Sequence, residues 1–495
     1  MTIKQNDIAV VWLKRDFRLR DHGALHQAIT NHQQIVLLYV AENSLRKEAH
    51  SSERHYDFIK QSINDLNKQL VPFNAHILAV EGEVIPVLEK LNAKMKLTGL
   101  YSHIETGIGL TFQRDKEVRK WCKQNNVPWR EERQQGVFRG MKNRKQWIQQ
   151  WSALMNKEQL PFPQKNAFIT NESLNTIAKN FTPLDLKTNS SPLVQPGGEQ
   201  NAHRYMDSFF NGRYTTYQAH ISKPDLARKT CSRLSPYLAF GNLSMRQVLQ
   251  RTEAEKEQGK RSQGMRAFES RLRWQAHFIQ KFEMECRMEF ESINRGYHRL
   301  EKAINPTFIN AWEKGLTGVP MVDAAMRCLV ETGYLNFRMR ALVVSFFVHQ
   351  LWQPWQACSA FLAQQFLDFE PGIHFPQLQM QAGETGINTL RIYNPVKNGL
   401  THDPNGSFTK KWIPELAELP DQLVHTPWEI TAFEEEMYGF RLGDNYPKPI
   451  VDIDQRRKEA SDLLWKMQKD PLVYQESKRI LSRHTLARRK SNRSA

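Results

Sequence analysis

The sequence predicts a two-part fold: an α/β N-terminal domain with a parallel, doubly wound sheet, and an all-α C-terminal domain. Residues 1–130 alternate short apolar runs with segments of helical periodicity, an order typical of a parallel sheet covered by helices. Residues 202–476 instead carry apolar side chains at helical spacing. We assign residues 131–201 to a linker, because the composition becomes rich in Pro, Asn, Thr, Ser and Gly from Gln159 to Glu199 without sustained periodicity.

Within the first part, four apolar runs predict strands and two periodic segments predict helices. The strands are expected at residues 8–13, 34–40, 75–80 and 97–103, and the helices at 51–70 and 113–125. The first of these helices starts with Ser and Glu, as a capped helix does. No Gly-x-Gly-x-x-Gly pattern follows the first strand, so a dinucleotide site of that kind is not predicted there.

The chain is strongly basic, since 69 Lys and Arg against 52 Asp and Glu give a formal charge of +17. Such a charge indicates a polyanionic partner, usually nucleic acid, because bound Lys and Arg side chains release phosphate counterions. The alternative is a basic surface that only keeps the protein soluble. Residues 477–495 are basic and almost free of large apolar side chains, which predicts a tail outside the packed domain.

The cysteines and the apolar runs indicate the cellular compartment that we expect for the protein. Five cysteines, at positions 122, 231, 286, 328 and 358, are scattered and form no Cys-x-x-Cys pair, so neither disulfides nor a metal site are expected. The first residues are too polar for a signal peptide, and no apolar run approaches the length of a membrane span. We expect a cytoplasmic, monomeric protein that binds neither membrane nor metal.

One stretch, residues 352–416, combines carboxylates and a histidine with several Pro and Gly breaks. Asp368, Glu370 and His374 lie close together in it, which suits a shaped pocket better than a plain core helix, although carboxylate pairs also occur on solvated surfaces. Upstream, Ser232 and Ser235 precede an apolar helical run. They could cap that helix, or offer hydroxyl and N–H groups to a phosphate.

Four ordered stretches resemble the photolyase/cryptochrome family. They are residues 10–21, with Val-Val-Trp-Leu-Lys-Arg-Asp; 231–241, with Cys-Ser-Arg-Leu-Ser-Pro; 318–340, with Gly-Val-Pro-Met-Val-Asp; and 352–416, with Arg-Ile-Tyr-Asn-Pro. The resemblance implies that residues 202–476 form a helical FAD-binding catalytic domain. It also implies that the N-terminal domain can hold a light-harvesting antenna chromophore, although no residue identifies such a pigment.

The resemblance assigns the cofactor site residue by residue. Asp368 and Arg340 match an ion pair beside the flavin ring, and a buried arginine and carboxylate need each other. Glu370 matches a second acidic position toward the adenosine or ribose. The remaining expected FAD contacts are Tyr217, Ser232, Arg233, Leu234, Ser235, Phe268, Arg271 and Phe337.

His374 falls where most of the family has an asparagine beside the reactive flavin nitrogen N5. A histidine there could change charge near neutral pH and so tune the reduced flavin. Alternatively, it is a neutral hydrogen-bonding group.

The tryptophan relay of the family is interrupted here. Leu378 and Lys302 occupy the positions of the inner and outer relay tryptophans, and only the middle position, Trp355, keeps its ring. An electron relay would have to use Trp355, Trp352 and Tyr393. Aromatic residues at helical spacing also occur simply as core.

The pocket that would receive damaged DNA also departs from the family pattern. Arg271 replaces a glutamate, Phe337 an asparagine and Met380 a tryptophan, which weakens the expectation of cyclobutane-dimer specificity because arginine accepts no hydrogen bond. Trp274 remains as a stacking platform. The expected DNA-binding residues are Arg271, Trp274, Arg338, Lys397 and Lys410.

The resemblance therefore implies a blue-light-dependent DNA repair flavoprotein that passes an electron from reduced FAD to a pyrimidine photoproduct in DNA. His374, Arg271 and Trp274 would be its catalytic residues. The alternative is a cryptochrome-like blue-light photoreceptor that signals through a protein partner. The altered lesion pocket and relay favour the sensor, whereas the charge of +17 favours repair.

Overall fold

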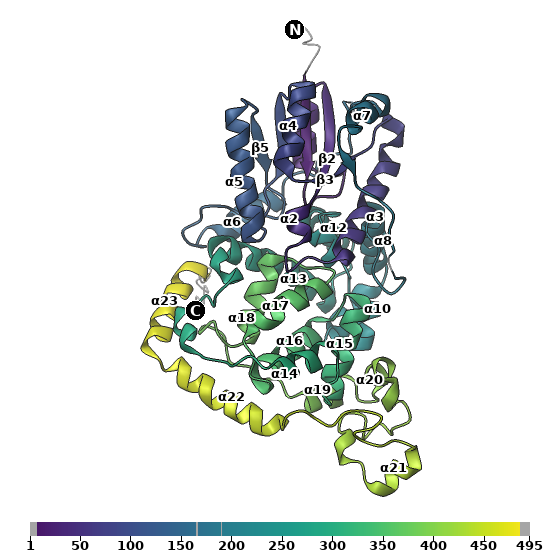
Figure 1. Ribbon diagram of the computed structural model, residues 1–495, viewed down its shortest axis with the longest axis vertical. Coiled ribbons are helices and arrows are strands. Elements are labelled where there is room, and N and C mark those ends of the chain that lie inside the picture. The colour runs from purple at the N-terminus through teal and green to yellow at the C-terminus, as the bar shows by residue number, and fades with distance from the viewer. Residues whose placement is uncertain (1–6, 165–166, 190, 486–495) are drawn as a thin grey trace.

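The computed structural model describes residues 7–164, 167–189 and 191–485. Figure 1 shows the α/β domain stacked on a larger helical domain. Among the described residues the sheet has six strands in the order β5-β4-β1-β2-β3-β6. They are β1 (Ile8–Leu13), β2 (Gln34–Glu42), β3 (Leu78–Gly82), β4 (Gly99–His103), β5 (Trp129–Glu132) and β6 (Thr182–Pro183). The four predicted strands are therefore confirmed.

The sheet is covered on both faces, which explains the apolar runs. Helices α1 (Gly23–Asn31) and α3 (Glu53–Leu70) share one core with Ala9 and Val11 of β1. Helices α4 (Val84–Met95) and α5 (Gly109–Gln124) share another core with Val10 and Trp12. Alternate residues of one strand thus enter opposite cores, and a strand buried on both faces reads as a continuous apolar run.

The sheet is mixed and not wholly parallel as predicted, because β6 pairs antiparallel to β3. β6 comes from the segment that the sequence analysis assigned to a linker. That segment also forms α6 (Trp147–Met155) and α7 (Asn171–Ala178). The linker prediction was wrong for these residues because Trp147, Trp151 and Met155 recur at helical spacing within a polar segment and pack into the core.

The second domain is helical, as predicted. Its α-helices are α8 (Glu199–Phe210), α9 (Tyr217–His220), α10 (Pro224–Thr230), α11 (Ser235–Ala239), α12 (Met245–Glu257), α13 (Gln263–Met284), α14 (Pro306–Glu313), α15 (Pro320–Thr332), α16 (Phe337–Ser345), α17 (Trp355–Gln365), α18 (Pro371–Gln381), α19 (Pro395–His402), α20 (Ser407–Trp412), α21 (Ala432–Tyr438), α22 (Ile453–Gln468) and α23 (Pro471–His484). Its short helices are η2 (Arg213–Thr215), η3 (Cys286–Glu289), η4 (Arg295–Arg299), η5 (Phe346–Gln350), η6 (Pro414–Leu416) and η7 (Pro427–Glu429), and the α/β domain adds α2 (Asn43–Arg46) and η1 (Val71–Phe73). Long α13 packs against α18, and these two helices with α11 and α16 position the site.

The predicted tail begins too early, because α23 continues through residue 477 to His484. Val473 and Ile480 lie two turns apart and are buried, which holds the helix on the domain. The carboxylate of Glu285 also binds the guanidinium groups of Arg479 and Arg483. The basic residues 488–490 of the predicted tail lie outside the described residues.

The two domains meet closely at the C-terminal end of α11 and the residues that follow it. Gly241 has φ of +68°, and a Cβ there would lie 2.2 Å from the carbonyl oxygen of Arg15, so this approach requires glycine. Arg15 Nε donates to the Ala239 carbonyl at 2.9 Å, and Arg18 Nη1 to the Gly241 carbonyl at 2.8 Å. The basic residues that end β1 thus fix the domain junction.

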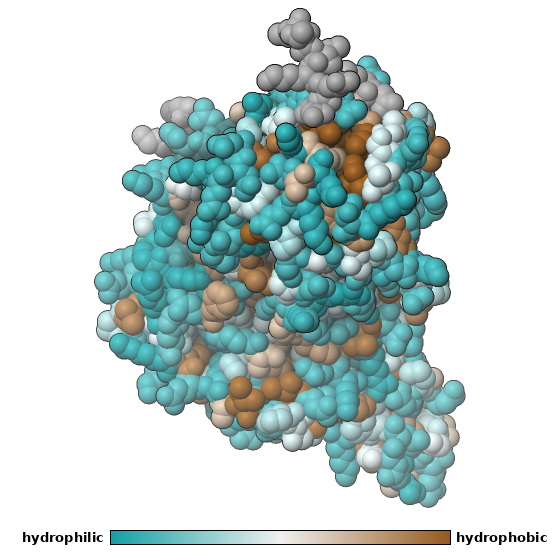
Figure 2. Space-filling model, turned by 45° about the horizontal axis from the view of Figure 1, so that its top comes forward, coloured by the Kyte–Doolittle hydropathy of each residue, from teal (hydrophilic) through white to brown (hydrophobic). Residues whose placement is uncertain are grey.

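In the part of the chain that the structure describes, no helix has both the length and the apolar character needed to cross a membrane. The face drawn in Figure 2 is largely hydrophilic, with hydrophobic side chains in separate groups.

Candidate functional site: a cavity in the helical domain

A cavity of about 700 Å³ opens among α11, α13, α16 and α18. Its size falls in the usual range for ligand sites, and its walls are mainly apolar with a few polar groups. It collects residues that lie far apart in the sequence. Of the predicted site residues, those that line it are Tyr217, Ser232, Arg233, Leu234, Ser235, Phe268, Arg271, Trp274, Phe337, Arg340, Asp368, Glu370, His374 and Tyr393.

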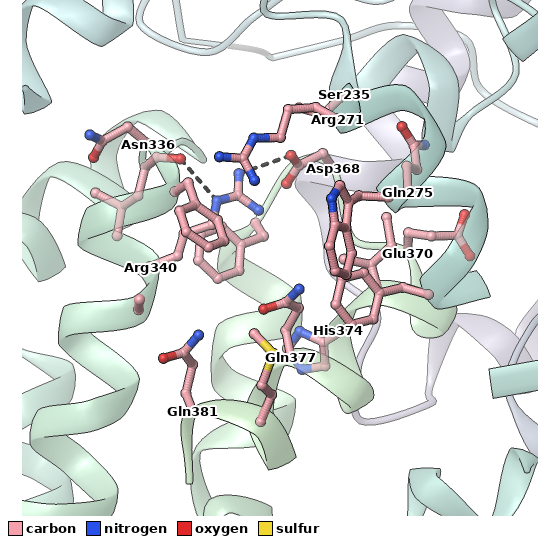
Figure 3. A pocket seen from close by; sticks show the side chains of 18 of the residues that line it. Ser235, Arg271, Gln275, Asn336, Arg340, Asp368, Glu370, His374, Gln377 and Gln381 are labelled. Carbon is pink, nitrogen blue, oxygen red and sulfur yellow. Dashed lines mark hydrogen bonds and ion pairs between the residues drawn. The ribbon is translucent and has the colours of Figure 1, made fainter. Parts of the chain in front are cut away.

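An ion pair joins two walls of the cavity. Arg340 Nη2 lies 2.8 Å from Asp368 Oδ2, and Arg340 Nε donates to the Leu335 carbonyl at 2.9 Å (Figure 3). Burial acts to raise the pKa of Asp368, but the adjacent charge of Arg340 outweighs it and the pKa is lowered. Asp368 is therefore a carboxylate at neutral pH. Its second oxygen, Oδ1, is buried without a partner of hydrogen-bonding geometry among the described residues.

The loop before α11 forms another wall. Leu234 is the N-cap residue of α11 and no side chain caps the helix, so Ser232 and Ser235 do not serve as its caps. Arg233 adopts φ of +59°, and its guanidinium carbon lies 3.7 Å from the ring centroid of Tyr334. Hydroxyl groups and a stacked arginine on one loop form a donor set suited to an anionic group such as a phosphate.

Glu370 lines the cavity, but its carboxylate pairs with a residue of the α/β domain. Its carboxylate lies 4.0 Å from Arg15 Nη2, and Figure 3 shows it turned away from Arg340. Burial raises its pKa. Glu370 thus connects the cavity wall to the domain junction.

His374 is buried and neutral. Burial lowers its pKa to about 3, and the nearby His50 acts in the same direction. Its Nε2 lies 3.0 Å from the Ser359 carbonyl oxygen. Because a carbonyl only accepts, Nε2 must carry the proton and donate it to this hydrogen bond. Desolvation opposes the imidazolium ion, so the structure favours the neutral hydrogen-bonding alternative over a charge switch near neutral pH.

The mouth of the cavity is aromatic and cationic. The guanidinium carbon of Arg271 lies 5.4 Å from the ring centroid of Phe337, and Arg271 forms no ion pair within the described residues. Trp274 is 49% exposed and Phe337 is 45% exposed. A cation without an ion pair can bind a phosphate or a base carbonyl, and an accessible ring in the same lining can stack a base.

The predicted relay residues do not all reach the cavity. Tyr393 lines it, but Trp355 is fully buried in the helical core and its Nε1 donates to Ser292 Oγ at 3.0 Å. Trp352 lies beneath Lys302, whose Nζ is 4.8 Å from the indole centroid. The structure therefore separates the two tryptophans from the cavity lining.

Three of the predicted DNA-binding residues also lie outside the lining. Arg338 follows Phe337 on α16 and is half-buried, and Lys397 is exposed on α19. Lys410 on α20 is held 3.2 Å from Asp421. Their role depends on how far a bound strand extends beyond the mouth.

The lining residues that the sequence did not predict as site residues include Gln377, Gln381 and Tyr334, the stacking partner of Arg233. The glutamines follow His374 by three and seven residues, so they lie on the same face of α18. That spacing was a usable signal once α18 was known to be a helix.

Comparisons with known proteins agree with this arrangement. The family model described as the FAD binding domain of DNA photolyase matches residues 268–466, and the DNA photolyase model matches residues 9–146. A deoxyribodipyrimidine photo-lyase of Alkalihalophilus pseudofirmus is 26% identical over 487 residues, covering 92% of this chain and 97% of its own.

Two solved structures share the whole fold. The cryptochrome of Synechocystis superposes with a TM-score of 0.83 at 20% identity and covers 93% of this chain and 100% of its own. An archaeal photolyase from Sulfolobus tokodaii, solved with two FAD molecules, gives a TM-score of 0.76 at 23% identity over 93% and 99% of the two chains.

Proposed function

Because this chain belongs to the photolyase/cryptochrome family, we propose that it is a blue-light-dependent DNA repair flavoprotein acting on a pyrimidine photoproduct. One observation carries the proposal. The cavity has a partly buried ion pair, Arg340–Asp368, in its wall, and Arg271, a cation without an ion pair among the described residues, shares its lining with the half-exposed Trp274. This arrangement suits an enclosed cofactor approached by a polyanion.

The residues present fit FAD, the cofactor of this family's helical domain. The volume of about 700 Å³ suits a large ligand, and Asp368 Oδ1 has no hydrogen-bond partner in the described chain. Asp368 and Arg340 would hold the ring, and Ser232, Arg233 and Ser235 the phosphates. When bound, FAD supplies the light absorption and the one-electron chemistry, which no side chain of this site provides.

The protein's own contribution is binding, orientation and a fixed charge state. His374 stays neutral and keeps its Nε2 proton on the Ser359 carbonyl, so its other ring nitrogen faces elsewhere as an acceptor only. Leu378, Phe366 and Ile373 line the wall with apolar surface and limit the access of water. The charge of Arg340 lowers the pKa of Asp368 against the effect of burial, which favours the ionised carboxylate.

The DNA would enter as an extruded lesion, because a base inside the stack cannot reach the cavity. Trp274 offers a stacking surface and Arg271 offers donors to a carbonyl or phosphate. The net charge of +17 attracts the backbone. A cryptochrome-like sensor with a protein partner needs neither the cationic mouth nor this charge, and it is the less favoured candidate.

The test is to irradiate lesion-containing oligonucleotides with blue light in the presence of the reduced protein. Cyclobutane dimers and (6-4) products should each be tried in single- and double-stranded DNA, with a dark sample as the control. We expect light-dependent loss of at least one lesion. If neither lesion declines although the protein carries FAD, the repair function is wrong.

The same protein preparation can be used to determine whether a second chromophore, an antenna pigment, is bound. Denaturing the purified protein and separating the released pigments by chromatography would identify an antenna chromophore beside FAD. Release of FAD alone would argue against an antenna.

A further inference from the structure

Two glutamine side chains of the cavity, Gln377 and Gln381, have hydrogen-bonding groups that the protein does not use. They lie one turn apart on α18, are half-buried and line the cavity. Figure 3 shows both amide groups reaching into the open space. Neither side chain forms a hydrogen bond with another described residue.

A neighbouring glutamine, Gln379, provides a comparison, because its side-chain amide is fully hydrogen-bonded within the protein. Gln379, on the opposite face of α18, is fully buried. Its Nε2 donates to the carbonyls of Met288 and Glu291, both at 2.9 Å, and its Oε1 accepts from Ile293 N at 2.8 Å. Every group of Gln379 is satisfied within the fold, whereas the amides of Gln377 and Gln381 remain free for a ligand.

The two carboxylates of the cavity are partly engaged by cations. One oxygen of Asp368 is held by Arg340, and the carboxylate of Glu370 is turned toward Arg15. Arg271 at the mouth offers donors only. Gln377 and Gln381 add two neutral amide acceptors on α18, and Gln275 adds another on α13.

A pyrimidine such as thymine presents an imide edge, in which the N3–H donor lies between two carbonyl acceptors. A primary amide carries an acceptor and donors in one plane, so it can pair with the N–H and a neighbouring carbonyl at once. A guanidinium cannot do this, because it accepts nothing.

We propose that Gln377 and Gln381 read the imide edges of the pyrimidine photoproduct. At each intact imide, an amide oxygen accepts N3–H and the amide nitrogen donates to the adjacent carbonyl. This assignment rests on the proposed function and names its ligand more closely: a photoproduct with at least one intact imide. It supplies the acceptor that Arg271 lacks, while Arg271 and Trp274 bind the phosphate and the base face.

The test combines changes in the protein with a change in the ligand. The wild-type protein and the double variant Gln377→Leu, Gln381→Leu are titrated in the dark with an oligonucleotide carrying a thymine photodimer. The same photodimer methylated at both N3 atoms is the second ligand. Binding is measured by fluorescence anisotropy, and bound flavin by absorption.

Methylation should weaken binding to the wild type by about tenfold, since it removes the N–H that the amides accept. The double variant should bind both ligands equally and about as weakly as the wild type binds the methylated one. Its flavin content should not change. The pair Gln377→Met, Gln381→Met repeats the test with an unbranched side chain, and exposed Gln124→Leu on α5 is the matched control.

Three results would overturn the inference, each for a different reason. Equal losses on methylation in the wild type and the double variants would mean that the methyl groups only obstruct binding. Loss of flavin from both double variants would assign the amides to the cofactor. A wild type that does not prefer damaged over undamaged DNA would remove the proposed function, and this inference with it.

Discussion

Asp368 and Arg340 are 28 residues apart in sequence, yet their side chains meet at 2.8 Å and join the segment before α18 to α16. The arginine is also stacked, with its guanidinium carbon 4.1 Å from the ring centroid of Phe366. The pair fixes the relative position of two cavity walls, and it leaves one carboxylate oxygen for a ligand.

Replacing Asp368 by alanine should release the flavin, because Arg340 would keep its charge in a largely desolvated site. Breaking a fully buried pair costs about 3–5 kcal/mol. The cost here should be lower, because the Arg340 side chain is 29% exposed. The ratio of flavin to protein absorption on purification measures the loss. The matched control is Asp421→Ala, which breaks the ion pair with Lys410 far from the lining. Full yellow colour in Asp368→Ala would contradict the assignment.

His374→Asn should change the absorption spectrum of the bound flavin before or after blue light, because it alters the neutral group placed beside the cofactor. In the wild type the same spectrum should stay constant between about pH 5 and pH 8, since the pKa of His374 is about 3. Spectra across this pH range provide both measurements. His76→Asn, in the α/β domain, is the control. A wild-type spectrum that titrates with a midpoint near pH 6.5 would show a charged His374.

Buried histidines should make the protein sensitive to acid. Burial lowers the pKa of His55 to about 4 and those of His349 and His374 to about 3. In the unfolded chain a histidine titrates near pH 6.5, so the unfolded state binds more protons below that pH. Stability is therefore full above about pH 6.5 and falls as the pH decreases, by about 2 kcal/mol per histidine at pH 5. Thermal unfolding at several pH values tests this, and an unchanged Tm between pH 7 and pH 5 would contradict it.

Trp274→Ala should weaken binding to damaged DNA by about tenfold, because base–aromatic stacking is worth about 1–3 kcal/mol. The flavin content should stay the same, since Trp274 is 49% exposed at the mouth. Anisotropy titrations with damaged and undamaged oligonucleotides separate stacking from general attraction. The exposed Trp465 on α22, replaced by alanine, is the control. Equal losses for both variants would remove Trp274 from the lesion pocket.

Lys397 and Lys410 provide a matched pair for the phosphate contacts. Lys397 is exposed and forms no ion pair in the described chain, whereas Lys410 is held by Asp421 at 3.2 Å. Lys397→Ala should therefore reduce the slope of log K against log salt by about 0.9, the value for one phosphate contact. Lys410→Ala should change it less. Affinities between about 50 and 200 mM salt give the slopes. A larger effect from Lys410 would place the DNA over α20.

Local pattern was enough to predict the strands of the α/β domain and the helical nature of the second. Strands such as β1 are buried on both faces and so read as apolar runs, and α13 carries a clear helical face. The linker assignment missed α6, although Trp147, Trp151 and Met155 recur at helical spacing, and it missed β6, which has only the two residues Thr182 and Pro183. Local pattern also placed the start of the tail inside α23.

The sequence by itself determined the two-domain fold class and the family resemblance, because these depend on residue type and spacing, and the resemblance in turn assigned many of the polar and charged residues of the cavity. The tertiary structure alone decided the charge state of His374, the pairing of Lys410 with Asp421 and the free amides of Gln377 and Gln381. The reason is physical: desolvation and hydrogen-bond satisfaction depend on which distant segments meet, and no local spacing encodes that.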